Sequence, residues 1–276
     1  NHRDHRKIII IDGNIGYTGG INLSDEYINA KEKFGHWKDA AILVEGEAVW
    51  NMTIMFLQLW SFISKQVMGS SKEYYQEDYN EFRPQGLKSD FSNINGFVQP
   101  FGDIPIDNEA VGENILINMI LKSKKYVYIF TPYLVIDHTM VMALTLAAKS
   151  GIDVRIVTPH IPDKWYVFLV TKSYYPVLIE SGVKIFEYTP GFLHSKAILC
   201  DDKVAVVGSI NLDYRSLYFH FECGVFLYKT NALKEIKDDF FKTFSKCQKI
   251  TLEECRRVSL PKRIFQAFLR LFAPLM

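Results

Sequence analysis

The sequence contains few cysteines, and none of them is arranged as a metal-binding or redox pair. Four cysteines lie far apart in the 276-residue chain and form no CxxC motif: Cys200, Cys223, Cys247 and Cys255. Three of them are in apolar segments. We therefore expect reduced, buried thiols and a reducing compartment, with neither a disulfide framework nor a zinc site.

Long apolar runs and a surplus of one charge are also missing. No uninterrupted run of about 18 apolar residues occurs, so no segment of this sequence is expected to span a bilayer. The first residues, NHRDHRK, do not have the pattern of a signal peptide. The formal net charge of +1 argues against a dedicated binder of duplex DNA, although a local basic cleft is compatible with it.

One pattern of residues occurs twice, once near each end of the chain. Counted from His5 and from His194, a lysine follows at the second position and an aspartate at the seventh. A glycine follows at the fourteenth position and an asparagine at the seventeenth. The matched pairs are Lys7 and Lys196, Asp12 and Asp201, Gly19 and Gly208, and Asn22 and Asn211. This agreement indicates an internal duplication, and two half-sites predict one composite site.

Two histidines on either side of one phosphate suit phosphodiester chemistry. A neutral imidazole can attack phosphorus to give a phosphohistidine, while a protonated imidazole donates a proton to the leaving oxygen. The lysines and asparagines of the repeat would bind the non-bridging oxygens and stabilise the transition state. The predicted catalytic group is His5, Lys7, Asp12, His194, Lys196 and Asp201, with Asn22 and Asn211 binding phosphate. This arrangement requires no metal and no other cofactor.

Each catalytic imidazole needs a hydrogen-bond acceptor on its second nitrogen. Asp39 and Glu222 are the candidates, whereas Asp12 and Asp201 end the first strand of each predicted hairpin and are assigned a supporting role. His220 lies two residues before Glu222 and either lines the cleft or is structural. The remaining histidines are expected to be surface or structural residues: His2, His36, His138 and His160.

The hydrophobic pattern predicts strands separated by helices. Hairpins are expected at 8–18 and 194–208, and further strands at 40–44, 126–131, 153–158, 183–188 and 222–228. Helices are expected at 47–67, 108–122, 137–149, 164–181 and 232–247. This alternation favours an α/β fold with a sheet covered on both faces.

The last residues, 259–276, predict an amphipathic helix that starts near Pro261. Its apolar stripe is flanked by basic residues: the stripe is Ile264, Phe265, Phe268, Leu271 and Phe272, and the basic residues are Lys262, Arg263 and Arg270. Docking on the domain surface and lying in a lipid interface are both compatible with this pattern.

The repeated signature H-x-K-x4-D followed by G-x-x-N resembles that of the phospholipase D superfamily. The resemblance implies two α/β/α lobes related by a pseudo-twofold axis, with the two histidines meeting at their interface and no metal. It also implies a phosphohistidine intermediate, with the N-terminal histidine as the nucleophile. The orienting acid would come from the opposite half, so that Glu222 holds His5 and Asp39 holds His194.

The resemblance also implies a division of the chain. Residues 1–68 would form the C-terminal portion of the first lobe, and the polar stretch 69–95 would be a linker. Residues 96–276 would form the second lobe with its amphipathic helix. Because the first motif starts at residue 5, the strands that should precede it are missing, and we expect a first lobe truncated at its N-terminus.

Within the superfamily, the sequence is most similar to bacterial cardiolipin synthases, through WKD, YIFTPYLVID and GSINLDYRSLYFHFE. Such enzymes join two phosphatidylglycerols, releasing glycerol, at the cytoplasmic side of the bacterial cell membrane. The resemblance implies phosphatidylglycerol and a lipid surface as partners and no nucleic acid. It does not define the oligomeric state. Asp4, Lys38 and His220 stand where asparagine, arginine and asparagine are usual. The family's N-terminal membrane helices are absent from this sequence.

Two other functions are compatible with the sequence. One is a hydrolase of the same superfamily that uses water as the acceptor and acts on phospholipid or nucleic acid. The other is a non-catalytic binding module with the same fold, against which the intact residues of both motifs argue.

Overall fold

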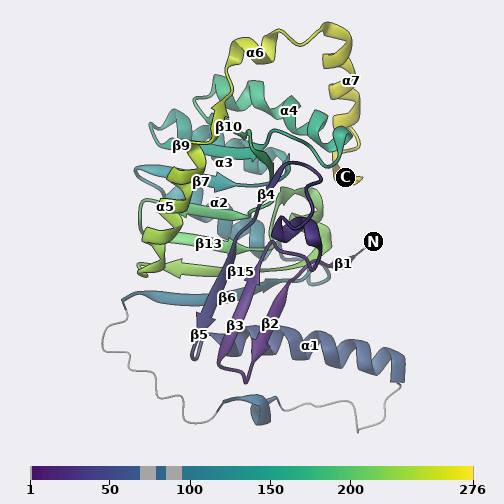
Figure 1. Cartoon of the computed structure of the whole chain (residues 1–276), viewed down its shortest axis with the longest axis vertical. Coiled ribbons are helices and arrows are strands. Elements are labelled where there is room, and N and C mark those ends of the chain that lie inside the picture. The colour runs from purple at the N-terminus through teal and green to yellow at the C-terminus, as the bar shows by residue number, and fades with distance from the viewer. Residues whose placement is uncertain (1, 69–78, 85–94, 276) are drawn as a thin grey trace.

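A mixed sheet of nine strands forms the centre of the protein in the computed structural model, which describes residues 2–68, 79–84 and 95–275 (Figure 1). The strand order is β1-β15-β13-β12-β7-β9-β10-β16, and β6 also pairs with β15. The strands are β1 Arg3–Asp4, β6 Phe97–Asp103, β7 Tyr126–Phe130, β9 Asp153–Pro159, β10 Lys184–Tyr188, β12 Ala197–Cys200, β13 Val204–Gly208, β15 His220–Tyr228 and β16 Cys247–Lys249.

Apolar side chains pack against both faces of this sheet, as predicted. One face is covered by α2 Val111–Lys122, α3 His138–Lys149 and α4 Trp165–Glu180, through buried residues such as Leu116, Leu144 and Leu178. The other face is covered by α5 Ala232–Phe244 and by the N-terminal part of the chain. Each face therefore has its own apolar core, because the central strands are buried on both sides.

The N-terminal part forms a smaller sheet with one long helix. The sheet consists of β2 Ile8–Ile11, β3 Ile15–Gly19 and β5 Ala41–Glu45, and α1 Val49–Met68 follows it. Asp12 and Gly13 have φ values of 52° and 64°, so the predicted Asp-Gly turn between β2 and β3 is correct. Val49 and Met52 of α1 are buried in the same core as Tyr128 and Phe130 of the large sheet.

Short parallel strand pairs join segments that are far apart in the sequence. β1 pairs with the start of β15, and β4 His36–Lys38 pairs with β11 Gly191–Leu193. A third pair joins β8 Leu134–Val135 to β14 Leu212–Asp213. The first two pairs bring the residues around each motif histidine against a segment from the other end of the chain.

Several short elements were not predicted from the sequence. They include β6, the π-helical turn η4 Arg215–Phe219, α6 Leu252–Arg256, and the 3-10 turns η2 Asn80–Phe82 and η5 Ala273–Leu275. A further 3-10 turn, η1, spans Asp25–Ile28. Pro100 and Gly102 interrupt the strand pattern of β6. The predicted helix at 232–247 is too long, because α5 ends at Phe244 and Cys247 starts β16. Most of the predicted linker at 69–95 lies outside the described residues.

The sequence predictions about the thiols are partly correct, and the predicted C-terminal helix is present. All four cysteines are free, but only Cys200 and Cys223 are buried; Cys247 and Cys255 are partly exposed at the start of β16 and in α6. The C-terminal helix is present as α7 Leu260–Arg270. Among the described residues, no helix combines the length and the apolar character needed to cross a bilayer.

Candidate active site

Each motif histidine contacts a carboxylate from the other end of the chain. His5 Nδ1 lies 2.9 Å from Glu222 Oε1, and His194 Nδ1 lies 2.7 Å from Asp39 Oδ2. The side chains of Glu222 and Asp39 are almost fully buried, with 0% and 3% exposed. These are the crossed contacts that the family resemblance implies.

The two short parallel strand pairs explain why these contacts form. Asp4 is paired with Phe221, so the next residues along the two chains are His5 and Glu222. In the same way Leu193 is paired with Lys38, and the next residues are His194 and Asp39. The amide of His5 donates to the Phe221 carbonyl at 3.0 Å, and that of His194 donates to the Lys38 carbonyl at 2.7 Å. The same local geometry is thus built twice.

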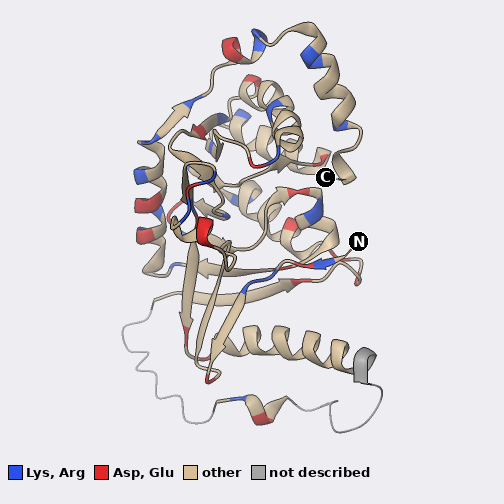
Figure 2. Cartoon of the chain, turned by 45° about the vertical axis from the view of Figure 1, so that its right-hand side comes forward, with Lys and Arg blue, Asp and Glu red and all other residues tan. Residues whose placement is uncertain are grey.

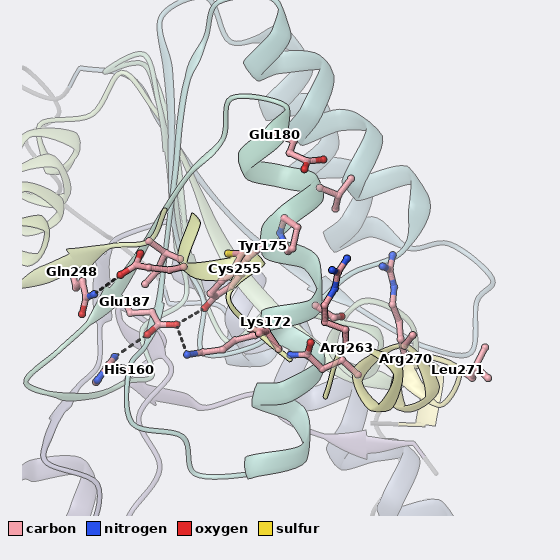
Figure 3. Close-up of a pocket in the computed structure, with 18 residues that line it drawn as sticks. His160, Lys172, Tyr175, Glu180, Glu187, Gln248, Cys255, Arg263, Arg270 and Leu271 are labelled. Atoms are coloured by element: carbon pink, nitrogen blue, oxygen red, sulfur yellow. Dashed lines mark hydrogen bonds and ion pairs between the residues drawn. The ribbon is translucent and has the colours of Figure 1, made fainter. Parts of the chain in front are cut away.

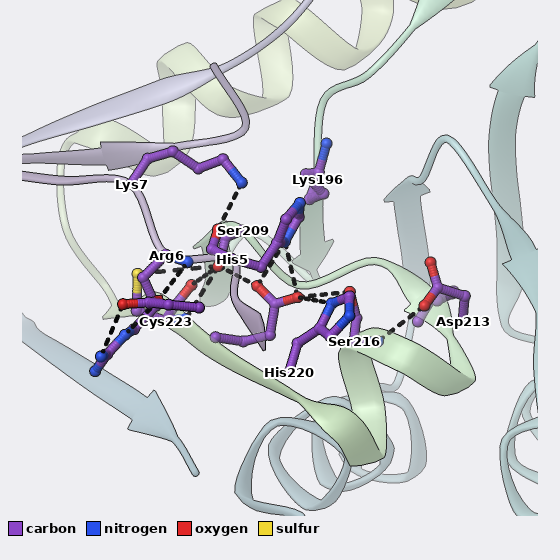
Figure 4. A network of polar contacts seen from close by, with 12 residues as sticks. His5, Arg6, Lys7, Lys196, Ser209, Asp213, Ser216, His220 and Cys223 are labelled. Carbon is purple, nitrogen blue, oxygen red and sulfur yellow. Dashed lines mark hydrogen bonds and ion pairs between the residues drawn. The ribbon is translucent and has the colours of Figure 1, made fainter. Parts of the chain in front are cut away.

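The motif lysines make matching contacts with the histidines, and Figure 4 shows Lys7, Lys196 and His5. Lys7 Nζ donates to the carbonyl of His5 at 2.5 Å, and Lys196 Nζ donates to the carbonyl of His194. Burial lowers the pKa of both ammonium groups, that of Lys196 to about 7, although the charges of Glu222 and Asp39 oppose this. Lys196 is also affected by the charge of Lys7. The two half-sites therefore lie close enough to share one electrostatic environment.

His194 is the more buried of the two histidines, with 7% of its side chain exposed. Burial, reinforced by the charge of Lys196, lowers its pKa to about 3 despite the hydrogen bond to Asp39. Burial alone would raise the pKa of Asp39, but the contacts with His194 and Lys196 outweigh it and the pKa is lowered. At neutral pH the site without substrate thus holds a neutral imidazole beside a carboxylate.

His5 is more accessible, with 25% of its side chain exposed, and its carboxylate is held by hydroxyl groups. Ser216 Oγ donates to Glu222 Oε1 at 2.7 Å, and Ser209 Oγ donates to Oε2. Neither serine was predicted from the sequence as part of the site. Ser209 lies directly after a motif glycine, which was the available signal, whereas Ser216 is placed by the unpredicted turn η4.

Two aromatic rings occupy equivalent positions next to the histidines. His220 is paired with Arg3 and its ring centroid lies 5.6 Å from that of His5. Trp37 is paired with Phe192 and its ring centroid lies 5.2 Å from that of His194. Among the described residues, the buried atoms without a hydrogen-bond partner include Trp37 Nε1 and both ring nitrogens of His220. The structure therefore places His220 beside His5, with Trp37 in the equivalent place beside His194.

Comparisons with known proteins agree with this geometry. The family described as "Cardiolipin synthase, PLD-like domain" matches residues 116–244. A protein of Halalkalibacterium halodurans named cardiolipin synthase is 37% identical over 278 residues, which is 100% of this chain and 53% of that protein. The chain belongs to the phospholipase D superfamily.

Two further proteins are similar to the chain, one in sequence and one in fold. An uncharacterized protein of Streptococcus mutans is 47% identical over 278 residues, covering 100% of this chain and 57% of that protein. The crystal structure of phosphatidylserine synthase from Haemophilus influenzae matches 99% of this chain and 69% of that chain, with a TM-score of 0.69 and 14% identity. The chain spans about half the length of the curated relatives it matches.

The aspartates of the two superfamily motifs do not join the site. Asp201 accepts hydrogen bonds from the backbone amides of Lys124, Lys125 and Tyr126, at 2.6, 2.8 and 2.9 Å. Asp12 is exposed in the equivalent turn. Each turn lies at the end of its hairpin strand that is farther from the motif lysine. Asp12 and Asp201 therefore lie in hairpin turns, which agrees with the supporting role assigned to them, and a catalytic role for them stays a prediction.

The motif asparagines have different surroundings. Asn211 is buried, and its Oδ1 has no hydrogen-bond partner among the described residues. Asn22 Nδ2 donates to the hydroxyl of Tyr27 at 2.6 Å, and the ring of Tyr27 lies 5.3 Å from that of His194. Binding of phosphate by Asn22 and Asn211 stays a prediction.

One group of potential metal ligands overlaps the site. His5, His220 and Glu222 each offer a ligand atom, and these atoms lie within 4.8 Å of one another, the single such group found in the described part of the chain. Glu222 already accepts hydrogen bonds from His5, Ser209 and Ser216. This pattern is typical of a carboxylate that orients an imidazole, and metal-free chemistry stays a prediction.

The other histidines lie in surface or structural positions. They are His2, bonded to the Phe219 carbonyl; His36, bonded to Tyr188; His138, exposed at the start of α3; and His160, bonded to Glu187.

Proposed function

We propose that the chain carries the active site of a phosphatidyltransferase that makes cardiolipin and glycerol from two molecules of phosphatidylglycerol. The observation that carries this proposal is the doubled histidine–carboxylate contact, with Lys7 and Lys196 beside it. The geometry supports phosphoryl-type transfer, and the similarity to cardiolipin synthases supports the choice of lipid. The repeated contacts also support two superfamily lobes related by a pseudo-twofold axis.

The more exposed histidine, His5, attacks the phosphorus atom of the first phosphatidylglycerol. The bond between phosphorus and the glycerol oxygen breaks, and His194 gives a proton to that oxygen, leaving a phosphatidyl group on His5. An anionic phosphate next to His194 favours the imidazolium form and so raises its low pKa when substrate binds. In the second half, a hydroxyl of another phosphatidylglycerol gives its proton back to His194 and attacks phosphorus, releasing His5.

The surrounding side chains orient these groups and stabilise charge. Glu222 and Asp39 accept the Nδ1 protons, which leaves Nε2 of each imidazole for the reaction. Lys7, Lys196 and the motif asparagines stabilise the non-bridging oxygens of the transition state. The reaction takes place at the cytoplasmic side of the bacterial cell membrane and requires no cofactor.

A lipid-product assay on the protein at its full natural length tests this function. With phosphatidylglycerol vesicles, mass spectrometry should show a four-chain lipid and free glycerol. The variants His5→Ala and His194→Ala should each lose activity by a factor on the order of 10³ or more. The variant His138→Ala changes an exposed histidine and should keep the normal rate.

Two results would contradict the proposal in different ways. Formation of phosphatidic acid alone would show that water is the acceptor and would favour the hydrolase. A near-normal rate in either histidine variant would contradict the composite site.

A further inference from the structure

Helix α7 presents its apolar side chains to solvent. Ile264, Phe268 and Leu271 are 62%, 53% and 75% exposed, and Leu260 before them is 67% exposed. These residues follow helical spacing and form one continuous face with Phe265 and Phe272. A helix that docks on its own domain turns such a face inward, so the orientation of α7 is the reverse of the usual one.

The side of α7 that meets the protein carries the polar residues Gln266 and Arg270 together with Leu269, which packs against the core; Arg270 is labelled in Figure 3. Gln266 is 7% exposed, and the guanidinium of Arg270 lies 4.1 Å from the ring centroid of Tyr174 on α4. Arg263, Gln266 and Arg270 border a cavity of about 800 Å³ that also contains polar groups of α4 and β10, such as Lys172 and Glu187. These contacts fix the orientation of the helix and hold its apolar face outward.

The charged residues of α7 are all basic, although the neighbouring helix α6 also carries acidic residues (Figure 2). From residue 255 to residue 275 the sequence contains five basic residues and no acidic residue. Arg256 and Arg257 pair with Glu180 and Glu253, whereas no ion pair involving Lys262, Arg263 or Arg270 is found in the described part of the chain. The apolar face is therefore accompanied by basic groups that no acid neutralises.

We propose that α7 lies in the interface of an anionic lipid bilayer. Its apolar face enters the boundary between headgroups and acyl chains, and Lys262 contacts lipid phosphates. A basic amphipathic helix has this preference because insertion removes apolar area from water while anionic lipids attract the cations. This role goes beyond catalysis, since it concerns where the protein binds and not what it converts.

The turn η5, which follows α7, is connected to the active site. The carbonyl of Leu275 accepts a hydrogen bond from Arg215 at 2.8 Å. Arg215 starts the turn η4, whose next residue, Ser216, donates to the carboxylate of Glu222. Figure 1 shows both the end of α7 and the N-terminal strand β1 on the same side of the molecule, with α1 at the far end. Insertion of α7 would therefore hold the site next to the lipid surface.

A vesicle flotation experiment with the 276-residue chain tests this proposal without any turnover. The chain should bind vesicles that contain phosphatidylglycerol and phosphatidylcholine, and bind phosphatidylcholine alone more weakly. The double variant Ile264→Ser/Phe268→Ser should reduce binding on the order of tenfold, because it removes two inserted side chains. Lys262→Glu should weaken binding to the anionic vesicles only.

The matched control is Met142→Ser/Leu146→Ser. These residues have the same spacing on α3 and are 51% and 54% exposed, so the same apolar area is removed elsewhere. This variant should bind as the unchanged chain does. Binding through other exposed residues, such as Trp60 on α1, is common to all variants and cancels in the comparison.

Several results would overturn the proposal. Unchanged binding in the α7 double variant would show that the helix is not inserted. Loss of a dimer on gel filtration, with vesicle binding unchanged, would show that the face joins two copies of the chain. Binding by the 276-residue chain but not by the full-length protein would show that another segment covers the face.

The remaining controls separate folding and catalysis from lipid binding. Circular dichroism melting checks that each variant is folded. If the double variant is not folded, Lys262→Glu, which changes an exposed side chain, is the deciding test. Weaker binding of Lys262→Glu to anionic vesicles would support the proposal, and unchanged binding would contradict it. The variant His194→Ala should still bind vesicles, so failure of the catalytic proposal and failure of this one give different results.

Discussion

At the scale of single residues, the same histidine–carboxylate contact is present twice in unequal surroundings. His194 is packed among Phe192, Trp37 and Tyr27, whereas His5 has an exposed edge and lies beside His220. Burial lowers the pKa of His194, which favours its neutral form, whereas the side chain of His5 is more accessible. The two histidines are therefore suited to different steps of one reaction.

The orienting carboxylates can be tested by amide substitution. In Glu222→Gln and Asp39→Asn the new amide can donate to Nδ1, which favours the wrong tautomer of the imidazole. We expect each variant to lower the rate of lipid transfer about 10³-fold to 10⁴-fold, measured at saturating phosphatidylglycerol. Glu187→Gln is the matched control. Glu187 is also buried, and its carboxylate lies 2.8 Å from Nδ1 of His160, which is not part of the active site. A normal rate for Glu222→Gln would contradict the orienting role.

The low pKa values of two histidines predict how stability depends on pH. In the unfolded chain an imidazole binds a proton below about pH 6.5. In the folded protein burial lowers the pKa of His194 to about 3 and that of His220 to about 4. Between the lowered pKa values and about pH 6.5, the unfolded state therefore binds more protons than the folded state. The free energy of unfolding thus falls as the pH is lowered from about 6.5 towards 4.

Denaturant titrations at pH 7 and pH 5 measure this effect. The variant His220→Asn removes one of the two groups and should lose less stability over the same interval. An equal loss in the variant and the unchanged protein would show that His220 does not contribute.

At the scale of secondary-structure elements, the motif aspartates belong to the hairpin turns. Asp201 holds the start of β7 through three backbone amides, whereas Asp12 accepts no hydrogen bond from the described residues. Both have positive φ, at 57° and 52°, a conformation that asparagine tolerates.

Substitution by asparagine at the two positions separates a role in folding from a role in catalysis. Asp201→Asn should lower the free energy of unfolding by about 1–3 kcal/mol, because the charged acceptor of three amides is lost, while the folded enzyme keeps its rate. Asp12→Asn should change neither property. Thermal unfolding and the lipid-transfer assay measure the two effects, and a large loss of rate with normal stability in Asp201→Asn would support a catalytic role.

The elements also show what the sequence could reveal. Long periodic segments such as α3, whose Asp137 cap accepts from the Met140 amide, were predicted to within a residue. Strands of two or three residues, such as β1 and β11, are too short to show a period. Their pairing nevertheless positions both histidines, so the crossed contacts followed from family resemblance and not from the pattern. The apolar stripe of α7 was visible, but periodicity alone could not show which side of the helix faces solvent.

At the scale of the whole molecule, a nearly balanced charge conceals a local excess. The net charge of +1 gives no indication of a charged surface, yet α7 contains three basic residues and no acidic one. The two packed cores on either side of the large sheet were predicted as a class, because strands that alternate with helices require cover on both faces. The place where the N-terminal sheet packs depends on side-chain shape and was not predictable.

The pairing of β1 with β15 has a consequence for the synthesis and folding of the protein. His5 and Glu222 are separated by 217 positions, so synthesis must pass Glu222 before the imidazole of His5 can meet its acceptor. Contacts between residues so far apart in the sequence form late in folding, because closing the intervening loop costs conformational entropy. A nascent or partly unfolded chain therefore has both histidines but not the geometry that activates them. The proposed reaction therefore requires that β1 has paired with β15.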